Sequence, residues 1–311
     1  MNTFSQLSPV ALFAYKRPDE LQRTLTALQA NHLASQTELY VFVDGPKNQF
    51  DLPKVNAVRK IVDGITGFQA VHRHYADQNC GLANSIITGV SRVMEKHGRA
   101  IVLEDDLLTT QNFLDYMNQC LQEYKHEMKV FSISGYSFPF VKPDNYQHDG
   151  YFIQRANSWG WATWADRWQK ADWLVSDYKI FKNDPDAKRG FKKGGSDLTK
   201  MIHQQQNNII DSWYIRWCYS QYRSNGLTIY PVLSKIQNVG FNKDATNTNV
   251  YNRYETKVDE GVERNFRLPK DIQPTNYYHR LNLNKYSLRT RLYNRVKTYI
   301  MRYRRILSVG T

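Results

Sequence analysis

Residues 100–106 read Ala-Ile-Val-Leu-Glu-Asp-Asp, an apolar run that leads directly into three acids. A short apolar run bounded by charged residues is typical of a buried strand. Three adjacent carboxylates at the end of such a strand repel one another when all are ionised, so they need a cation or several donors nearby. A hard divalent ion that also binds substrate phosphates would supply this charge. The alternative is an acidic start to a helix near Thr110.

Apolar runs alternate with amphipathic segments on both sides of this stretch. The predicted strands cover residues 10–15, 39–43, 69–75, 100–103 and 130–133. The predicted helices lie between them and begin near residues 17, 55, 82 and 113. This alternation indicates βαβ units, and therefore an α/β fold with a mostly parallel sheet flanked by helices. Ligands of such sheets bind beyond the carboxyl ends of the strands, where the polar residues here are Lys16, Arg17, Asp44, 74–79 and 104–106.

The second half of the chain is rich in aromatic residues and contains all seven Trp. We expect residues 180–200 to form a charged loop and residues 207–223 to form a helix. Residues 228–232 should form a strand. Residues 238–249 are rich in Gly, Asn and Thr, so we expect a mobile loop there.

The composition excludes several classes of protein. The 311 residues are 41% hydrophobic and 14% aromatic, which is enough apolar surface to form a core. No apolar window is long enough for a transmembrane helix, and residues 1–8 lack the order of a signal peptide. Cys80, Cys120 and Cys218 are widely spaced, and they fit neither a disulfide framework nor a zinc site. We therefore expect a protein of the reducing cytoplasm.

The net charge of +13 is concentrated at the C-terminal end, since residues 281–311 carry eight Lys or Arg and no acid. Apolar residues recur among them at helical spacing, from Leu288 to Leu307, which predicts a basic amphipathic helix. Such a helix can bind an anionic membrane surface, here through residues 285–311. The alternative is a helix packed on its own domain with a solvated basic face. No recognised nucleic-acid module is present, so we expect no nucleic-acid partner.

Two common nucleotide motifs are absent. The chain has neither a P-loop nor a Gly-x-Gly-x-x-Gly segment after the first strand, where residues 15–18 read Tyr-Lys-Arg-Pro instead. This argues against P-loop hydrolysis and ordinary dinucleotide binding.

In combination, these segments resemble a nucleotide-sugar-dependent glycosyltransferase of the GT-A fold. In that family a short acidic motif ends the fourth strand of a Rossmann-like sheet, and residues 104–106 stand in its place, in the variant typical of the N-acetylglucosaminyltransferase I type. Val43-Asp44-Gly45 looks like the second-strand Asp that contacts uracil or ribose. Residues 79–84, Asn-Cys-Gly-Leu-Ala-Asn, look like the segment that opens the third helix near the nucleotide, with Asn79 and Asn84 as contacts.

The resemblance continues into the second half and covers about residues 8–250. Residues 157–164, Asn-Ser-Trp-Gly-Trp-Ala-Thr-Trp, are similar to the aromatic segment of bacterial polysaccharide sugar transferases. Asp211-Ser212-Trp213 matches an Asp-Asp-Trp segment that carries the catalytic base, although the second Asp is Ser here. Residues 238–241 resemble a flexible loop that folds over the donor.

The resemblance implies a division of the chain and a reaction. Residues 1–135 would be the nucleotide-sugar-binding half, residues 136–275 the acceptor-binding and catalytic half of the same domain, and residues 276–311 the basic helix. The reaction would be an inverting transfer from a UDP-sugar, such as UDP-GlcNAc, to a glycan or lipid-linked glycan acceptor. This would serve bacterial surface polysaccharide or lipopolysaccharide synthesis at the inner face of the plasma membrane.

The resemblance also assigns roles to single residues. Asp106 would hold Mn²⁺ or Mg²⁺, which neutralises the leaving diphosphate, while Asp105 lies near the ribose and Glu104 near the donor sugar. Asp211 would be the base that activates the acceptor hydroxyl. Its alternative role is a helix cap or a partner for Arg216, and the weaker candidates for the base are Asp166 and Asp244.

Aromatic and basic residues complete the expected site. Trp159, Trp161 and Trp213 would stack on sugar rings, with Gly160 allowing close backbone approach. The alternative for the first two Trp is core packing. Basic residues would contact uracil or the diphosphate, or else form exposed basic loops; they are Lys16, Arg17 and Arg73.

Two other functions share these features. A non-catalytic carbohydrate-binding protein on the same fold would use the aromatic half, but it has no need of three confined carboxylates. A sugar-phosphate nucleotidyltransferase would use the same acids. Such enzymes carry a Gly-rich basic segment after the first strand, which is missing here.

Overall fold

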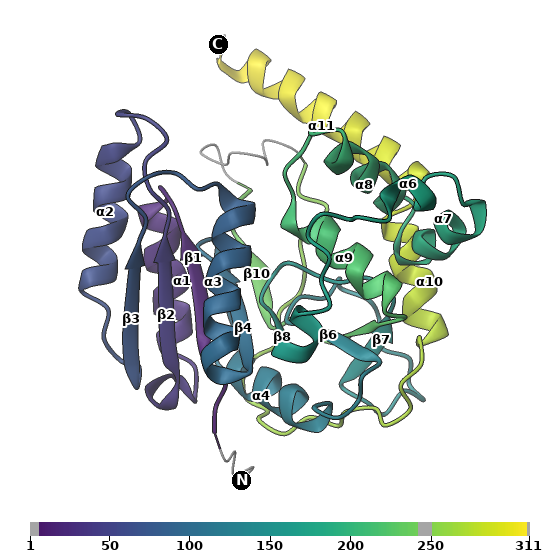
Figure 1. The fold of residues 1–311 in the computed structure, drawn as a ribbon, viewed down its shortest axis with the longest axis horizontal. Coiled ribbons are helices and arrows are strands. Elements are labelled where there is room, and N and C mark those ends of the chain that lie inside the picture. The colour runs from purple at the N-terminus through teal and green to yellow at the C-terminus, as the bar shows by residue number, and fades with distance from the viewer. Residues whose placement is uncertain (1–5, 242–250, 310–311) are drawn as a thin grey trace.

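The computed structural model describes residues 6–241 and 251–309, and a mixed eight-stranded sheet forms its centre (Figure 1). The strand order is β3-β2-β1-β4-β8-β6-β9-β7. The bounds are β1 Val10–Ala14, β2 Glu38–Val43, β3 Ala70–Tyr75, β4 Arg99–Glu104, β6 Val130–Ser134, β7 Gly150–Ile153, β8 Trp161–Trp164 and β9 Leu227–Pro231. The first four strands pair in parallel, as do β6 and β9, whereas β8 and β7 run antiparallel to their neighbours. The predicted α/β fold with a mostly parallel sheet is confirmed.

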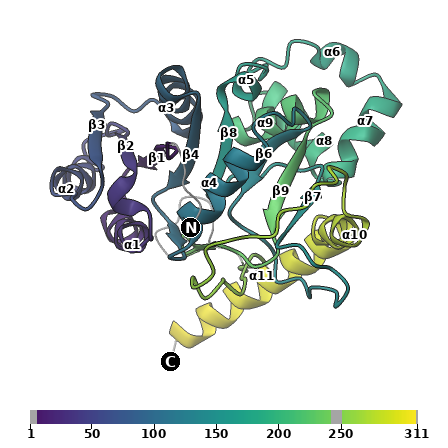
Figure 2. The same cartoon turned by 90° about the horizontal axis from the view of Figure 1, so that it is seen from below.

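Helices cover both faces of this sheet (Figure 2). Successive strand residues point to opposite faces, so Leu12 joins one apolar cluster and Phe13 the other. The first cluster includes α1 (Pro18–Gln29), α2 (Leu52–Asp63) and α4 (Phe113–Glu123). The second includes α3 (Leu82–His97) and α9 (Trp213–Arg223). A sheet buried on both faces explains why its inner strands are continuous apolar runs.

The N-terminal elements form where the sequence predicts them, because their signals are local. Helix α1 begins at Pro18 and has Asp19 and Glu20 in its first turn, where the helix dipole favours acids. A short 3-10 helix, η1 (Ala34–Gln36), precedes β2. No separate boundary appears near residue 135, since β6 lies in the same sheet as β4, with β8 between them.

The charged loop expected at residues 180–200 is wrong. This region contains the short helices α6 (Tyr178–Phe181), α7 (Pro185–Phe191), η2 (Lys192–Gly194) and α8 (Leu198–Gln206). The Asp184 side chain caps α7 by accepting hydrogen bonds from the backbone of Asp186 and Ala187. Phe181 and Phe191 anchor these helices against Tyr219 of α9.

Two further expectations in this half need correction. Helix α9 begins at Trp213 and not at Asn207, because Ser212 caps it by accepting from the Ile215 backbone N–H. The Trp-rich segment forms β8 and the short helix α5 (Ala165–Trp168). The strand expected at 228–232 is confirmed as β9.

A second, two-stranded sheet joins β5 (Leu107–Thr109) to β10 (Ile236–Asn238) in antiparallel register. Both strands are too short to give a periodic signal, and the sequence does not predict them. This small sheet brings residues 238–241 onto the segment that follows β4. The rest of the loop expected at 238–249 lies outside the described residues.

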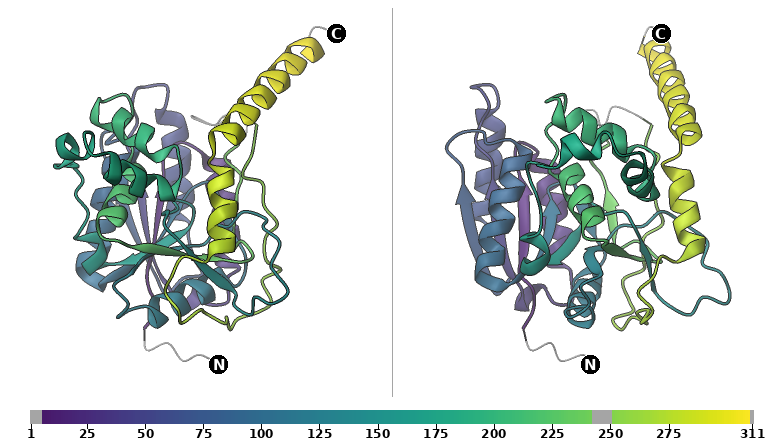
Figure 3. Two further views of the ribbon diagram at one scale, coloured as in Figure 1. Left: turned by 90° about the vertical axis from the view of Figure 1, so that its right-hand side faces the viewer. Right: turned by 45° about the vertical axis from the view of Figure 1, so that its right-hand side comes forward.

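The C-terminal region forms two helices, α10 (Asn276–Lys285) and α11 (Leu288–Val309). Helix α10 packs on the sheet through Tyr278, whose ring stacks on Tyr151 with centroids 4.0 Å apart. Helix α11 extends away from the body of the protein (Figure 3). Among the described residues, no helix combines the length and the hydropathy that a membrane crossing requires.

Candidate functional site

The three acids end β4 and turn directly into β5. Glu104 is the last residue of β4, and Asp105 and Asp106 form the turn before Leu107. Helix α4 begins only at Phe113, after Asn112, so the alternative of an acidic helix start is wrong. We call residues 104–106 the acidic turn.

Neighbouring segments hold the acidic turn in place. The backbone N–H of Tyr15, just after β1, donates to Asp105 Oδ2 at 3.2 Å. Thr24 Oγ1 of α1 donates to the Asp105 carbonyl at 2.8 Å. Arg17 Nη1 donates to Asp106 Oδ2 at 2.7 Å, which forms a largely buried ion pair. The predicted site residues Arg17, Asp105 and Asp106 therefore lie together.

If all three acids of the acidic turn were ionised, they would carry more negative charge than Arg17 can neutralise. Burial, together with Asp106 and Asp105, raises the pKa of Glu104 to about 8. Burial and Asp106 raise the pKa of Asp105 to about 7. Burial also raises the pKa of Asp106, although Arg17 opposes this effect. A bound cation would favour the ionised forms of these groups.

Gly240 lies directly against the acidic turn. The Val239 N–H donates to the Asp106 carbonyl at 2.9 Å, which brings the end of β10 over the acids. A Cβ on Gly240 would lie 2.0 Å from Asp106 Oδ2 and 3.1 Å from Arg17 Nη1. Only glycine allows this approach, so Gly240 belongs to the site. Residues 238–241 were predicted to cover the donor, but the sequence does not reveal the contact with Asp106.

The acidic turn does not form a complete metal cage. Within the described ranges, no three His, Cys, Asp or Glu side chains converge as metal ligands. Mg²⁺ retains several waters and often takes only one or two protein carboxylates together with substrate phosphates. The donor set therefore fits a divalent ion shared with a phosphate ligand, with Asp106 as the carboxylate nearest to Arg17.

Asp44 organises the loop after β3. Its two carboxylate oxygens accept hydrogen bonds from the backbone N–H groups of Gly45, Cys80 and Gly81 and from Asn79 Nδ2, at 2.8–3.0 Å. These four donors use the usual acceptor capacity of a carboxylate. Asp44 thus fixes the turn that carries Asn79. Asn84 lies exposed in the first turn of α3 and donates to the Cys80 carbonyl.

Lys16 belongs to a small polar cluster that the sequence does not predict. Lys16 Nζ lies 2.7 Å from Asp51 Oδ1, and the Tyr15 hydroxyl donates to Asp51 Oδ2 at 2.7 Å. The hydrogen bond from Lys16 lowers the pKa of Asp51. Burial and the bond to Asp51 raise the pKa of Tyr15 to about 12. The cluster fixes the β1–α1 connection that carries Arg17.

Arg73 is not part of this site. Its guanidinium donates to the backbone carbonyls of Val62, Asp63 and Ile65 at the end of α2. A cation at a helix C-terminus is a stabilising interaction with the helix dipole. The expected contact of Arg73 with uracil or the diphosphate is wrong.

Two of the three predicted sugar-binding Trp are core residues. Trp161 is 1% exposed and Trp213 is 3% exposed, and their rings stack with centroids 5.1 Å apart. Trp168 and Trp217 pack against Trp161 and against each other. Because other rings cover their faces, Trp161 and Trp213 cannot stack on a sugar in this structure.

Trp159 differs because it is only partly buried. It contacts Tyr136, Tyr254 and Phe241 edge to face. Gly160 has a φ of +55°, and a Cβ there would lie 2.6 Å from the Ile236 side chain. Gly160 therefore allows close packing on β10, and not the approach to a ligand that we expected.

Asp211 precedes α9 with a 63% exposed side chain and pairs with Arg216 Nη2 at 2.8 Å. The partner that we expected for a structural role is therefore present. Of the weaker candidates for the base, Asp166 pairs with the buried Arg167, and Asp244 lies outside the described residues.

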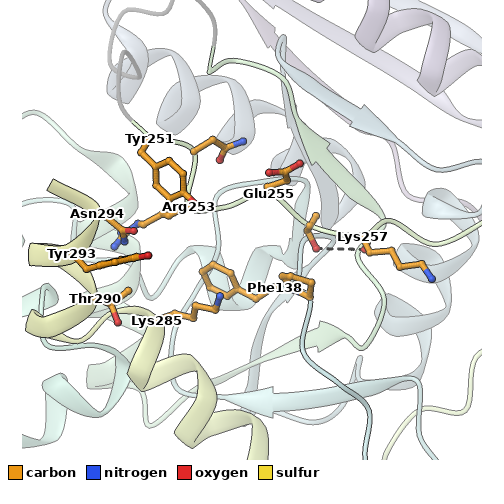
Figure 4. A pocket seen from close by; sticks show the side chains of 12 residues that line it. Phe138, Tyr251, Arg253, Glu255, Lys257, Lys285, Thr290, Tyr293 and Asn294 are labelled. Atoms are coloured by element: carbon orange, nitrogen blue, oxygen red, sulfur yellow. Dashed lines mark hydrogen bonds between the residues drawn. The ribbon is translucent and has the colours of Figure 1, made fainter. Parts of the chain in front are cut away.

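A pocket of about 580 Å³ lies beside Phe138 (Figure 4). Phe138, residues 251–253 and 255–257, and the α10–α11 junction line it. A series of contacts leads from it to the acidic turn: Gly240 lies on Asp106, the next residue Phe241 contacts Tyr254, and Tyr254 stands in the sequence between the lining residues Arg253 and Glu255. No motif in the sequence marks this pocket, because three distant segments form it.

No family model matches the chain, and no curated protein matches its sequence. The fold and the site define a class: an α/β protein with a mostly parallel central sheet and a partly buried acidic turn at the carboxyl end of an inner strand.

Proposed function

We propose that this protein is an inverting, metal-dependent glycosyltransferase of the GT-A type that moves a sugar from a UDP-sugar to a glycan acceptor. The acidic turn carries the proposal. Asp105 is buried and Glu104 and Asp106 are partly buried, and confining three acids beside one arginine costs free energy that packing alone does not require. Binding of a cation, which in turn binds a diphosphate, would offset this cost.

Different residues have different roles in the proposed reaction. The acceptor oxygen bonds to the anomeric carbon of the donor, the bond from that carbon to the diphosphate breaks, and the diphosphate leaves with the electron pair. Asp106 would hold Mn²⁺ or Mg²⁺, and this ion would supply Lewis-acid neutralisation of the leaving group. Arg17, ion-paired with Asp106, adds positive charge on the same side. The Asp44–Asn79 turn and the Lys16 cluster position the nucleoside part of the donor.

Asp211 takes the proton of the acceptor hydroxyl in this proposal. Its exposed carboxylate is accessible, and Arg216 orients it. A positioned base contributes roughly 10²–10⁴ in rate. Trp159 remains the aromatic residue that can face a sugar, since its ring is only partly covered.

We propose that the acceptor is a lipid-linked glycan in bacterial surface polysaccharide or lipopolysaccharide synthesis, and the exposed face of α11 supports this. Six large apolar side chains of α11 are 47–74% exposed: Leu288, Leu292, Tyr293, Val296, Tyr299 and Ile300. Basic residues lie between them in the sequence. A helix with such a face binds anionic membrane surfaces, which would place the protein on the inner face of the plasma membrane.

A donor screen tests the proposal. Thermal unfolding is measured with a panel of nucleotide sugars, with and without Mn²⁺, because a ligand that binds only the folded state raises its stability. We expect a UDP-sugar to stabilise the wild type only when Mn²⁺ is present. Asp106→Asn should unfold normally without ligand and lose the metal-dependent shift. Asp271→Asn, an exposed acid on a distant loop, is the matched control.

Three results would contradict the proposal. An unchanged metal-dependent shift in Asp106→Asn would remove the metal assignment. Stabilisation by free glycans without any nucleotide sugar would indicate the non-catalytic carbohydrate-binding protein. Stabilisation by a sugar phosphate and a nucleoside triphosphate would indicate the nucleotidyltransferase.

A further inference from the structure

The pocket beside Phe138 is built by three segments that are far apart in the sequence. Phe138 follows β6, residues 251–257 form an irregular segment with a turn at Arg253 and Tyr254, and Lys285, Tyr293 and Asn294 come from α10 and α11. The Tyr251 N–H donates to Thr298 Oγ1 at 3.1 Å, which ties this irregular segment to α11. The volume of about 580 Å³ is that of a small-molecule site.

Two cations face this pocket without a carboxylate partner. Within the described part of the chain, neither Arg253 nor Lys285 forms an ion pair. Lys285 Nζ lies 5.2 Å from the centre of the Phe138 ring, and the Arg253 guanidinium lies 4.6 Å from that of Tyr254. Glu255 also lines the pocket, but Figure 4 shows its carboxylate turned away from Lys285.

Arg253 and Lys285 carry like charges that repel each other. Burial and the nearby positive charge of Arg253 both lower the pKa of Lys285. A like-charge pair of this kind is relieved when an anion binds between the two groups. Arginine is also well suited to phosphate, because its planar fork donates two parallel hydrogen bonds.

The rest of the lining suits a sugar attached to such an anion. Tyr251, Tyr293 and Phe138 present aromatic rings around the same space, as Figure 4 shows. Asn294 lies beside Arg253 there, and its Nδ2 is a buried donor without a hydrogen-bond partner among the described residues. A polar donor set within an aromatic lining is typical of small-molecule sites.

We propose that this pocket binds the phosphate or diphosphate group of the acceptor between Arg253 and Lys285. The assignment of the occupant as the acceptor rests on the proposed function. It follows from position: Phe241 contacts Tyr254, the neighbour of Arg253, while Gly240 lies on Asp106. The wall supplied by α11 continues into its exposed apolar face, so an acceptor held in a membrane by a lipid can reach the pocket.

Binding of inorganic pyrophosphate to the full chain, measured by titration calorimetry in EDTA, tests the pocket directly. Without divalent ions, the acidic turn does not attract the probe. We expect Arg253→Gln and Lys285→Gln each to raise the Kd at least about tenfold, which equals about 1.4 kcal/mol. Arg289→Gln should bind as the wild type does. Arg289 is an exposed residue of α11 outside the lining of the pocket, so this variant tests the general effect of the positive charge of the helix.

Unchanged binding in the Arg253 and Lys285 variants would overturn the proposal. Equal weakening in Arg289→Gln would also overturn it, because it would show a diffuse charge effect. Circular dichroism and thermal unfolding confirm that each variant is folded, and Arg253→Lys should retain part of the affinity because it keeps the charge.

The outcome for the pocket is separable from the outcome for the proposed function. If pyrophosphate binds through Arg253 and Lys285 while no nucleotide sugar binds, the pocket is supported and the glycosyltransferase proposal fails. If sugar transfer occurs and both variants keep the wild-type KM for the acceptor, the pocket proposal fails alone. Geranyl diphosphate distinguishes the sources of the anion: tighter binding than pyrophosphate supports a lipid-linked acceptor, and equal binding supports a free phosphorylated one.

Discussion

At the scale of single residues, Gly240 is the position where space is most restricted. Its backbone lies against the ion pair between Asp106 and Arg17, and a methyl group there would overlap the Asp106 carboxylate. This close approach couples the end of β10 to the acidic turn. A substitution that adds one carbon therefore tests whether the geometry of the acidic turn matters for ligand binding.

We expect Gly240→Ala to weaken Mn²⁺-dependent binding of the donor at least about tenfold, or about 1.4 kcal/mol. The new Cβ must displace either Asp106 or the end of β10, while the cores on the two faces of the sheet remain intact. Donor titration and thermal unfolding measure the two effects separately. Gly64→Ala is the control, since its Cβ would meet its nearest neighbour at an ordinary 3.6 Å. Normal donor binding in Gly240→Ala would show that the contact has no functional role.

At the scale of elements, Arg155 joins four parts of the second half. Its guanidinium forms two hydrogen bonds with Asp197, just before α8, at 2.8 and 3.0 Å. It also donates to Tyr214 of α9 and lies 3.6 Å from the centre of the Tyr286 ring, at the end of α10. The arginine side chain is only 3% exposed. Removal of one partner would leave a buried charge uncompensated.

Asp197→Asn should lower the free energy of unfolding by about 3–5 kcal/mol at pH 7, the usual cost of breaking a buried ion pair. Urea denaturation measures this loss. Asp186→Asn breaks an exposed pair with Arg189, and it should cost only about 0–1 kcal/mol. Similar losses in the two variants would mean that burial does not strengthen the Arg155 pair.

The same ion pair makes a prediction about pH. Burial alone would raise the pKa of Asp197, but Arg155 lowers it below its usual value. A lowered folded-state pKa contributes stability above the unfolded value of about 3.9, and this contribution is lost as pH falls through the folded-state pKa. The difference in stability between the wild type and Asp197→Asn should therefore shrink on acidification below about pH 4. A constant difference over that range would contradict the assignment.

At the scale of the whole molecule, contacts connect the acidic turn, the pocket that we propose for phosphate, and α11. Asp106 contacts Gly240, the aromatic residues after it reach the pocket, and α11 supplies the pocket wall before it extends outward. The apolar residues Leu288, Leu292, Val296, Tyr299 and Ile300 of α11 are 47–74% exposed, whereas Tyr293 also lines the pocket. This exposed face is the one that we propose to bind a membrane surface.

We expect the triple variant Leu288→Ser, Leu292→Ser and Val296→Ser to reduce binding to anionic vesicles at least about tenfold. Each substitution removes apolar area from the face that we propose to bind the membrane, at about 25 cal/mol per Å². Co-sedimentation with vesicles of phosphatidylglycerol measures the change. Val262→Ser replaces an apolar residue that is 78% exposed and lies outside α11, and it serves as the control. Unchanged co-sedimentation of the triple variant would exclude α11 as the anchor.

The sequence by itself determined the N-terminal half of the sheet and the position of the acids. These signals are local: an apolar strand, a proline at a helix start and a carboxylate run after residue 103 each follow from neighbouring residues. The short helices at 178–206 escaped prediction because their anchors, Phe181 and Phe191, are recognisable only once Tyr219 lies beside them.

Tertiary structure alone decided which residues the candidate site contains. The sequence does not distinguish a Trp in a core from a Trp on a sugar-binding surface. Only the fold shows that Trp161 and Trp213 are buried and that Trp159 is partly exposed. Gly240 and the pair of Arg253 and Lys285 acquire their roles through contacts between segments far apart in the sequence. Spacing along a chain specifies periodic local structure, whereas proximity across the fold depends on how those elements pack.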